Sequence, residues 1–118
     1  MLMKLSKDKA ESMISRIYEL RFVRLQIHVN GHAGAIWVYL GRNSDYVIIP
    51  GVFCSCKDYV IRTIINKTSS FCKHQAGLYI ALKESKYVVV NVDFEEAYRI
   101  IQEIIDKGIS QSLRKKLK

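Results

Sequence analysis

The chain has 118 residues, of which 49% are hydrophobic and 25% are charged, and its formal net charge is +8. That length supports one domain with a hydrophobic core and excludes two independent cores. No apolar run approaches the roughly 18 residues of a membrane-spanning helix, and the first residues contain no hydrophobic signal core. We therefore expect a cytoplasmic protein whose cysteines stay reduced.

The positive charge is distributed unevenly along the chain. Residues 21–86 carry nine basic and three acidic side chains, whereas residues 87–108 carry two basic and five acidic ones. The last ten residues add four basic side chains. A basic middle segment is compatible with a polyanionic partner, and equally with a surface that is merely soluble.

The first predicted elements are a helix and a strand. Ser6 is a suitable N-cap, and apolar residues at helical spacing predict a helix that continues to Tyr18. From Phe22 to Val29 apolar and polar residues alternate, which predicts a half-buried strand. The Asn30-Gly31 step is a hairpin signal, and the nearby Gly34 favours a loop longer than two residues.

Two further strands are expected before the cysteines. One runs from Ala35 to Leu40 and the other from Tyr46 to Ile49, after a polar turn. Pro50-Gly51 ends the third strand and leads the chain towards Cys54. The pattern therefore predicts a small antiparallel sheet in meander order.

The second half of the chain is predominantly helical in pattern. Short helices are predicted over 57–65 and from Lys73 to about Glu84, and the β-branched run 87–90 is either a strand or a buried connection. Asp93-x-x-Glu96 reads as a capping box for a helix that ends at Gly108. We predict one α+β domain over 1–108 with flanking helices, and a basic flexible tail over 109–118.

Four residues in the middle of the chain have the types and spacing of metal ligands. Cys54 and Cys56 form a CxC pair, and Cys72 and His74 form a CxH pair after fifteen intervening residues. A tetrahedral zinc ion takes four nitrogen or sulfur ligands, usually as two close pairs from two local elements. Four protein ligands leave no position for water or substrate, so we expect structural zinc at the end of the sheet.

Other readings of the cysteines remain open. Two of the three could form a disulfide, or all three could be small buried hydrophobic residues. A Cys72–His74 nucleophile pair is also conceivable, but it leaves the CxC pair unexplained. His28 and His32 are expected to be strand and loop residues, because four better-spaced ligands already exist.

The two ligand pairs resemble the SWIM zinc finger, whose signature is CxC followed at a distance by CxH. The similarity covers roughly residues 36–86 and includes Tyr59 and Gly77. Within that family, the long insert before Cys72 and the small size are most similar to the stand-alone, archaeal SWIM subunits of Shu-type recombination mediators. Two positions depart from the family pattern: Lys57 stands where Pro is common, and Gln75 where a large aliphatic residue is common.

The resemblance implies a recombination accessory factor that acts with a RecA-family recombinase paralogue and with DNA, single-stranded or duplex. No catalytic constellation is visible: Asp45, Asp58 and Glu84 are isolated and expected to be solvated, so we expect no enzyme activity. The alternatives are a pure protein adaptor or a transcription-related regulator without DNA contact. The candidate phosphate-binding residues are Lys57, Arg62, Lys67, Lys73, Arg114, Lys115 and Lys116.

Overall fold

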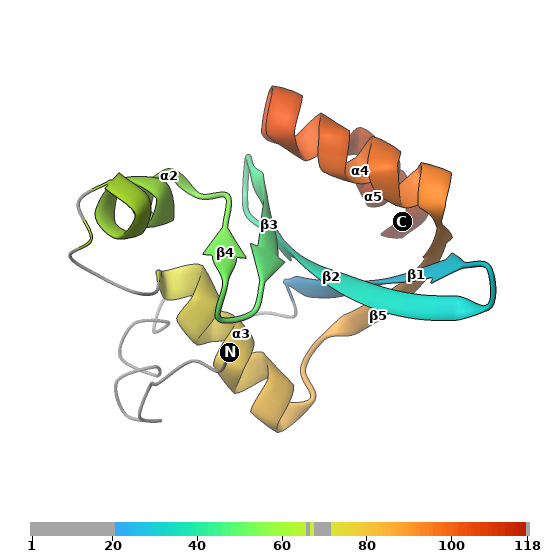
Figure 1. The fold of residues 1–118 in the computed structure, drawn as a ribbon, viewed down its shortest axis with the longest axis horizontal. Helices are drawn as coiled ribbons and strands as arrows, with labels where there is room; N and C mark the ends of the chain where they lie inside the picture. Colours follow the sequence, from blue (N-terminus) through green and yellow to red (C-terminus); the bar gives the residue numbers. More distant parts are fainter. Residues whose placement is uncertain (1–20, 66, 68–71, 118) are drawn as a thin grey trace.

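The computed structural model describes residues 21–65, 67 and 72–117 (Figure 1). The helix expected from Ser6 to Tyr18 lies outside these residues. In chain order the elements are β1 (Phe22–Val29), β2 (His32–Leu40), β3 (Asp45–Ile49), β4 (Phe53–Cys54), α2 (Lys57–Tyr59), the π-helical turn η1 (Val60–Ile65), α3 (Lys73–Glu84), β5 (Val88–Asp93), α4 (Phe94–Lys107) and α5 (Gln111–Leu117). Within the described part of the chain, no helix is both long and apolar enough to span a bilayer.

The strands form one mixed sheet in the order β4-β3-β2-β1-β5, which confirms the α+β class. Strands β1 to β3 pair antiparallel as a meander, as predicted, and the short β4, which the sequence analysis did not predict, continues it. The expectation of an all-antiparallel sheet is wrong, because β5 pairs parallel to β1, with Val23 opposite Val88. Because β2 occupies only one edge of β1, the β-branched run 88–90 finds the other edge available for ladder hydrogen bonds.

The β1–β2 hairpin is closed by a two-residue turn, not by the longer loop expected from Gly34. Asn30 and Gly31 both have positive φ values, 48° and 80°. This left-handed pair matches the right-handed twist of the two strands, and Asn-Gly is the dipeptide that adopts it most readily. Gly34 instead lies within β2, opposite Ile27.

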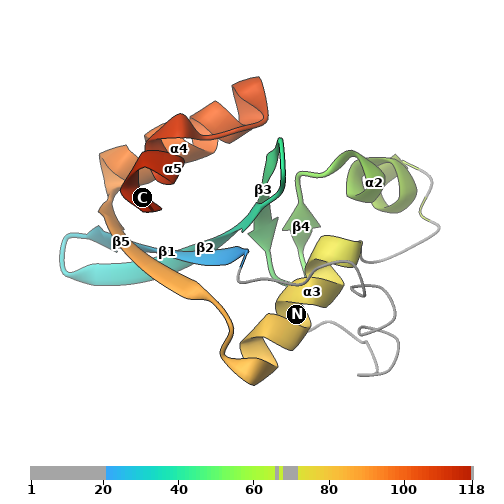
Figure 2. The ribbon, with the colours of Figure 1, turned by 180° about the vertical axis from the view of Figure 1, so that it is seen from behind.

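Two hydrophobic cores lie on opposite faces of the sheet, because successive strand residues point to opposite sides. Helix α3 covers one face, and α4 with α5 covers the other, as Figure 2 shows from behind. The α3-side core consists of Phe22, Trp37, Ile48, Cys54, Cys56, Tyr59, Cys72, Leu78 and Ala81. The α4-side core consists of Val23, Leu25, Val38, Val47, Val92, Ala97, Ile100, Ile104 and Leu113.

Helix α4 begins and ends at the predicted capping signals. At the start of α4 the Asp93 carboxylate accepts from the Glu96 amide at 2.8 Å, and the Glu96 carboxylate accepts from the Asp93 amide. Gly108, with φ 77°, ends α4 in the left-handed conformation that glycine adopts without strain. Ser85 ends α3 in the same region, with φ 54°.

The expected flexible tail is a helix in the structure. Residues 111–117 form α5, and its Leu113 is fully buried in the α4-side core. The Arg114 guanidinium donates hydrogen bonds to the Asp45 carboxylate and to the carbonyl of Gly41. Asp45, expected to be solvated, is only 1% exposed and also accepts from the Ser110 amide at 2.9 Å. The ion pair and the apolar anchor therefore hold α5 against the start of β3.

Candidate metal centre

The CxC pair lies where the edge of the sheet turns into a helix. Cys54 ends β4 opposite Ile48 of β3, so its backbone is fixed by the strand ladder. Ser55 continues the attachment, because its amide donates to the Val47 carbonyl and its Oγ accepts from the Val47 amide, both at 2.9 Å. Cys56 is the N-cap of α2, and its sulfur accepts from the Tyr59 amide at 3.3 Å. This strand-to-helix bend turns both sulfurs to one side.

The CxH pair lies at the start of α3, as the sequence predicted. Cys72 is the N-cap, in extended conformation, and His74 is the second residue of the helix. Residues two apart at a helix start reach the same point because the N-cap lies outside the helical turn. The positive end of the α3 dipole and its first amides favour the negative charge of thiolates at this position.

The four side chains converge on one buried point. The three sulfurs and one imidazole nitrogen all lie within 4.8 Å of one another. His74 Nδ1 is 3.9 Å from both Cys54 Sγ and Cys72 Sγ. A tetrahedral zinc ion with ordinary bond lengths places its donor atoms about 3.6–3.8 Å apart, so the arrangement fits such an ion if the most distant donors move closer by up to about 1 Å. All three cysteines are free thiols, and the four residues could hold a metal ion.

The thiols influence one another's ionisation. A hydrogen bond between Cys54 and Cys56 raises the pKa of Cys54 and lowers the pKa of Cys56, which holds the thiolate. At Cys72 a hydrogen bond with Cys54 lowers the pKa, but a hydrogen bond with Cys56 and burial outweigh it and raise the pKa to about 11. These hydrogen bonds favour ionisation of Cys56 over that of Cys54 and Cys72, and a divalent ion would stabilise the thiolate form of all three.

A buried glutamine supports the site, and sequence reasoning did not identify it. Gln75 follows the ligand His74 and is 1% exposed. Its amide donates to the Phe53 carbonyl at 3.0 Å, and its Oε1 accepts from the Gly51 amide at 3.0 Å. The side chain thus joins α3 to the turn that leads into Cys54. A polar residue directly before the apolar run 76–82, on the helix that the run predicts, was the available signal.

Aromatic rings enclose the histidine. The His74 ring centroid is 4.6 Å from that of Tyr39 and 4.6 Å from that of Tyr46. These tyrosines come from neighbouring positions of β2 and β3, so the sheet fixes the orientation of the imidazole. His28 and His32 are exposed and do not belong to the cluster; His28 Nε2 hydrogen-bonds Asn91 Oδ1 instead.

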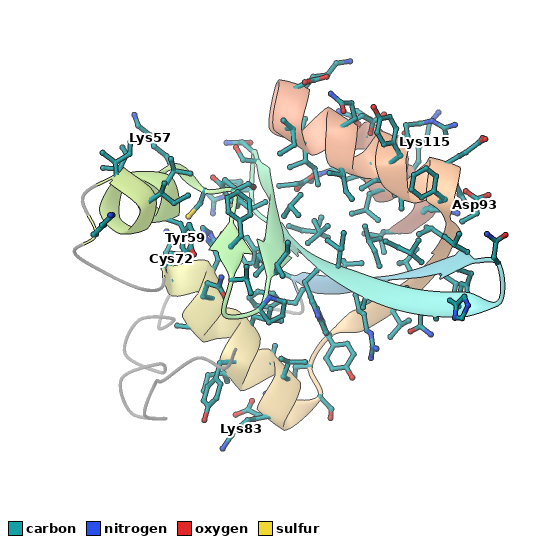
Figure 3. The ribbon with its side chains drawn as sticks, in the orientation of Figure 1. Lys57, Tyr59, Cys72, Lys83, Asp93 and Lys115 are labelled. Carbon is teal, nitrogen blue, oxygen red and sulfur yellow. The ribbon has the colours of Figure 1, made fainter. Side chains whose placement is uncertain are left out.

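The predicted phosphate-binding residues fall on two separate surfaces. Lys57 and Lys73 are exposed and adjoin the ligands Cys56 and Cys72, and Lys67 is exposed after η1. The position of the Arg62 side chain lies outside what the structure describes. Lys115 lies at the far side of the molecule from Lys57, as Figure 3 shows.

The two basic neighbours of Lys115 already have carboxylate partners. Arg114 is paired with buried Asp45, and Lys116 forms an ion pair of 2.9 Å with Glu96. Their charges therefore help to hold α5 in place. The structure does not bring the basic residues of α5 together with those beside the ligands.

Apolar side chains are exposed close to the ligand pairs. Ile64 and Ile65 of η1 are 50% and 66% exposed, and Val52 in the β3–β4 turn is 55% exposed. Exposed apolar side chains that form a contiguous patch mark protein-binding surfaces. Sequence reasoning predicted a helix over 57–65 but not which of its side chains would be exposed to solvent.

Comparison with known proteins identified no family: no protein-family model, curated protein or solved structure matches the chain. The similarity to SWIM zinc fingers therefore depends on the two ligand pairs and their neighbours alone.

Proposed function

We propose that the four residues bind one zinc ion and that this ion is structural. Three thiolates and one imidazole are a donor set of structural zinc, and hard metals such as magnesium and calcium prefer oxygen ligands. When bound, the ion cross-links the end of β4 and the start of α2 to the start of α3. Elemental analysis of the purified protein tests this and should give one zinc per chain. A folded protein with no metal, or with a Cys54–Cys72 disulfide, contradicts the proposal.

The function that we propose is DNA binding as an accessory factor, through phosphate contacts. The observation that carries it is the position of Lys57 and Lys73, each exposed and each next to a buried ligand in the chain. A bound ion would fix the backbone of both lysines, so their charges would be presented with little loss of conformational entropy. No base-reading pattern is visible, so the contacts should be independent of sequence.

A salt series distinguishes this function from nonspecific charge effects. Fluorescence anisotropy with single-stranded and duplex DNA should show an affinity that falls steeply with salt, because released counterions drive phosphate binding. The triple change K57E/K67E/K73E should nearly abolish binding. The control K83E/K86E/K107E alters net charge equally on exposed lysines elsewhere and should bind like the parent apart from a small long-range effect.

The SWIM resemblance supports one further element of the proposal. We propose a RecA-family recombinase paralogue as the protein partner and homologous recombination as the setting. Isolation of the protein from its native source under low-salt conditions should recover such an ATPase in stoichiometric amount. Recovery of a transcription complex instead would favour the regulator alternative.

The second candidate is a protein adaptor that does not touch DNA. The exposed side chains of Val52, Ile61, Ile64 and Ile65 favour it, because phosphates make no use of apolar contacts. Substitution of Ile64 and Ile65 by serine should leave DNA affinity unchanged if the lysines act alone. If the protein binds no DNA even at low salt, and the Ile64/Ile65 variant loses its partner, the adaptor function replaces the first proposal.

A further inference from the structure

Strand β5 forms an edge of the sheet and lacks the features that normally protect such an edge. It pairs with β1 on one side, and no strand in the part of the chain that the structure describes pairs with its other side (Figure 2). Natural proteins block an open edge with lysine, proline, a bulge or a very short strand, because its unpaired backbone N–H and C=O groups can accept another strand. The six residues of β5, VVVNVD, include no lysine or proline, and their pairing with β1 is continuous, without a bulge. The edge is therefore suited to bind a β-strand.

The side chains of β5 leave this edge accessible. Val88 and Val89 are 37% and 45% exposed, and Asn91 is exposed as well. Of the six residues only Val92 is buried, in the α4-side core. The three consecutive valines 88–90 favour the extended conformation that strand pairing requires. A facing strand would also cover the two exposed valines, which stabilises the pair beyond its hydrogen bonds.

A second copy of the chain offers a matching edge. The described sheet has two edges, β4 and β5. Because β4 has only two residues, pairing of β5 with the β4 edge of another copy would form a very short ladder and an open-ended chain of copies. Two β5 edges can pair along all six residues. In the antiparallel direction a twofold axis relates the two strands, about six main-chain hydrogen bonds form, and both edges are closed at once.

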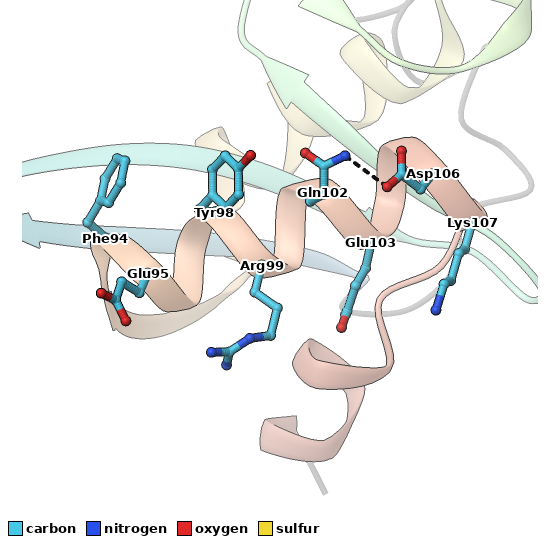
Figure 4. Close-up of a pocket in the computed structure, with 8 residues that line it drawn as sticks. All are labelled: Phe94, Glu95, Tyr98, Arg99, Gln102, Glu103, Asp106 and Lys107. Carbon is cyan, nitrogen blue, oxygen red and sulfur yellow. Dashed lines mark hydrogen bonds between the residues drawn. The ribbon is translucent and has the colours of Figure 1, made fainter.

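The charges around the two ends of β5 favour the antiparallel direction. Beside its start lie two lysines and one carboxylate: Lys83, Lys86 and Glu84. Beside its end lie three carboxylates and two basic side chains: Asp93, Glu95, Glu96, Arg99 and Lys116. Ion pairs within the chain, Lys86 with Glu84 and Lys116 with Glu96, cancel part of the charge at each end. Glu95 and Arg99 project from the same side of α4, as Figure 4 shows.

The remaining charge is positive beside the start of β5 and negative beside its end, since Asp93 and Glu95 outnumber Arg99. An antiparallel pair of β5 strands places the start of each strand next to the end of the other, so opposite charges meet at both ends. A parallel pair would bring like charges together.

From these features we propose that the chain forms a twofold-symmetric dimer in which the β5 strands of two copies pair antiparallel and join the two sheets into one. The candidate ligand Cys54 lies on β4, at the opposite edge of each sheet, so the dimer carries one candidate metal centre towards each of its ends. The pairing requires neither the metal nor DNA. Its failure and the failure of the proposed functions are therefore separate outcomes.

Sedimentation equilibrium of the full chain tests the dimer and should show a monomer–dimer equilibrium. Val89→Lys introduces the residue that blocks natural edge strands, near the middle of the pairing, and should weaken the dimer at least about tenfold. The matched control Val52→Lys adds the same charge at a valine of the β3–β4 turn that is 55% exposed, and should leave the dimer unchanged. Hydrogen exchange locates the contact: amides within 88–93 should exchange more slowly as the dimer forms, and this protection should be absent in Val89→Lys.

The direction of pairing has its own test. Lys86→Glu and Glu95→Lys each bring like charges together at both ends of the antiparallel dimer, and each should weaken it by about tenfold. An equimolar mixture of the two variants should restore dimers, because opposite charges meet again at both ends of a mixed pair. A mixture that stays monomeric overturns the antiparallel direction.

Several other results would overturn the proposal. They are a monomer at every concentration, a dimer that Val89→Lys leaves intact, and a dimer without slower exchange within 88–93. Assemblies that keep growing with concentration would assign the β5 edge to open-ended pairing instead. Thermal unfolding checks that each variant is folded, which is expected because the replaced side chains are exposed.

Discussion

The side-chain amide of Gln75 donates a hydrogen bond of 3.0 Å to the carbonyl of Phe53. Gln75 follows the candidate ligand His74, and Phe53 precedes the candidate ligand Cys54, so this contact joins the two ligand pairs. His74 and Cys54 are thereby positioned by a contact that involves neither of their own side chains. Groups that orient metal ligands from outside the coordination shell commonly change metal affinity by about 10- to 100-fold. The contact is therefore expected to matter for binding as well as for folding.

The first prediction concerns this contact. Gln75→Leu, which introduces a side chain of similar size without hydrogen bonds, should weaken zinc binding by about tenfold or more. The partly buried Gly51 amide would lose its acceptor as well. Competition with a chromophoric chelator measures the affinity. Gln111→Leu, at an exposed position of α5, is the control and should bind zinc like the parent.

The second prediction tests the ligand set. Cys56→Ser and His74→Ala should lose the metal and unfold at a much lower temperature, because binding energy at a site formed only on folding is folding energy. His28→Ala and His32→Ala should retain both metal and stability. Elemental analysis and thermal unfolding give the two readouts. Loss of metal in His32→Ala with retention in His74→Ala would overturn the assignment.

The third prediction concerns protons released on metal binding. In the metal-free protein the raised pKa values of Cys54 and Cys72 keep both thiols protonated at pH 7, while the lowered pKa of Cys56 leaves it ionised. Zinc binding should therefore release about two protons near pH 7. Apparent affinity should rise by roughly 100-fold per pH unit there, and fall as the pH is lowered. Calorimetry in two buffers of different ionisation enthalpy counts the protons. A count near zero would mean that all three thiols were already ionised.

The fourth prediction separates structure from charge in α5. Arg114→Gln leaves the fully buried Asp45 carboxylate without its guanidinium, and should lower the free energy of unfolding by about 2 kcal/mol, since part of Arg114 is exposed. Lys115→Gln, next to it on the surface, should change stability by less than about 0.5 kcal/mol. Denaturant unfolding measures both. Equal effects of the two substitutions would contradict a structural role for Arg114.

Local signals in the sequence predicted the parts of the fold that depend on near neighbours. The Asp93–Glu96 capping box, the glycine stop at Gly108 and the span of α3 are confirmed, because each is decided within one or two helical turns. The four candidate ligands converge as their spacing indicated. Whether the ion is zinc, and whether DNA is bound, stay predictions.

Features that depend on distant partners were missed. The Asp45–Arg114 pair joins the start of β3 to the last helix, and neither residue has a neighbour in sequence that reveals the other. Without that pair and the burial of Leu113, the basic tail had no visible reason to fold. Gln75 was treated as a departure from a family pattern, because its acceptors are backbone atoms of a distant turn. The parallel pairing of β5 was missed for the same reason, because its partner β1 is distant in the sequence.

The position of β5 has a consequence for how the molecule is made. During synthesis β1 emerges first and pairs with β2 almost at once, but its other edge waits for β5, whose Val88 emerges long after Val23. Both ligand pairs are translated in that interval. A nascent chain with an open strand edge is prone to pair with its neighbours on a polysome. Metal capture at residues 54–74 would fix the start of α3 before β5 emerges, so cells short of the metal should accumulate aggregates of the newly made chain even where the mature protein is stable.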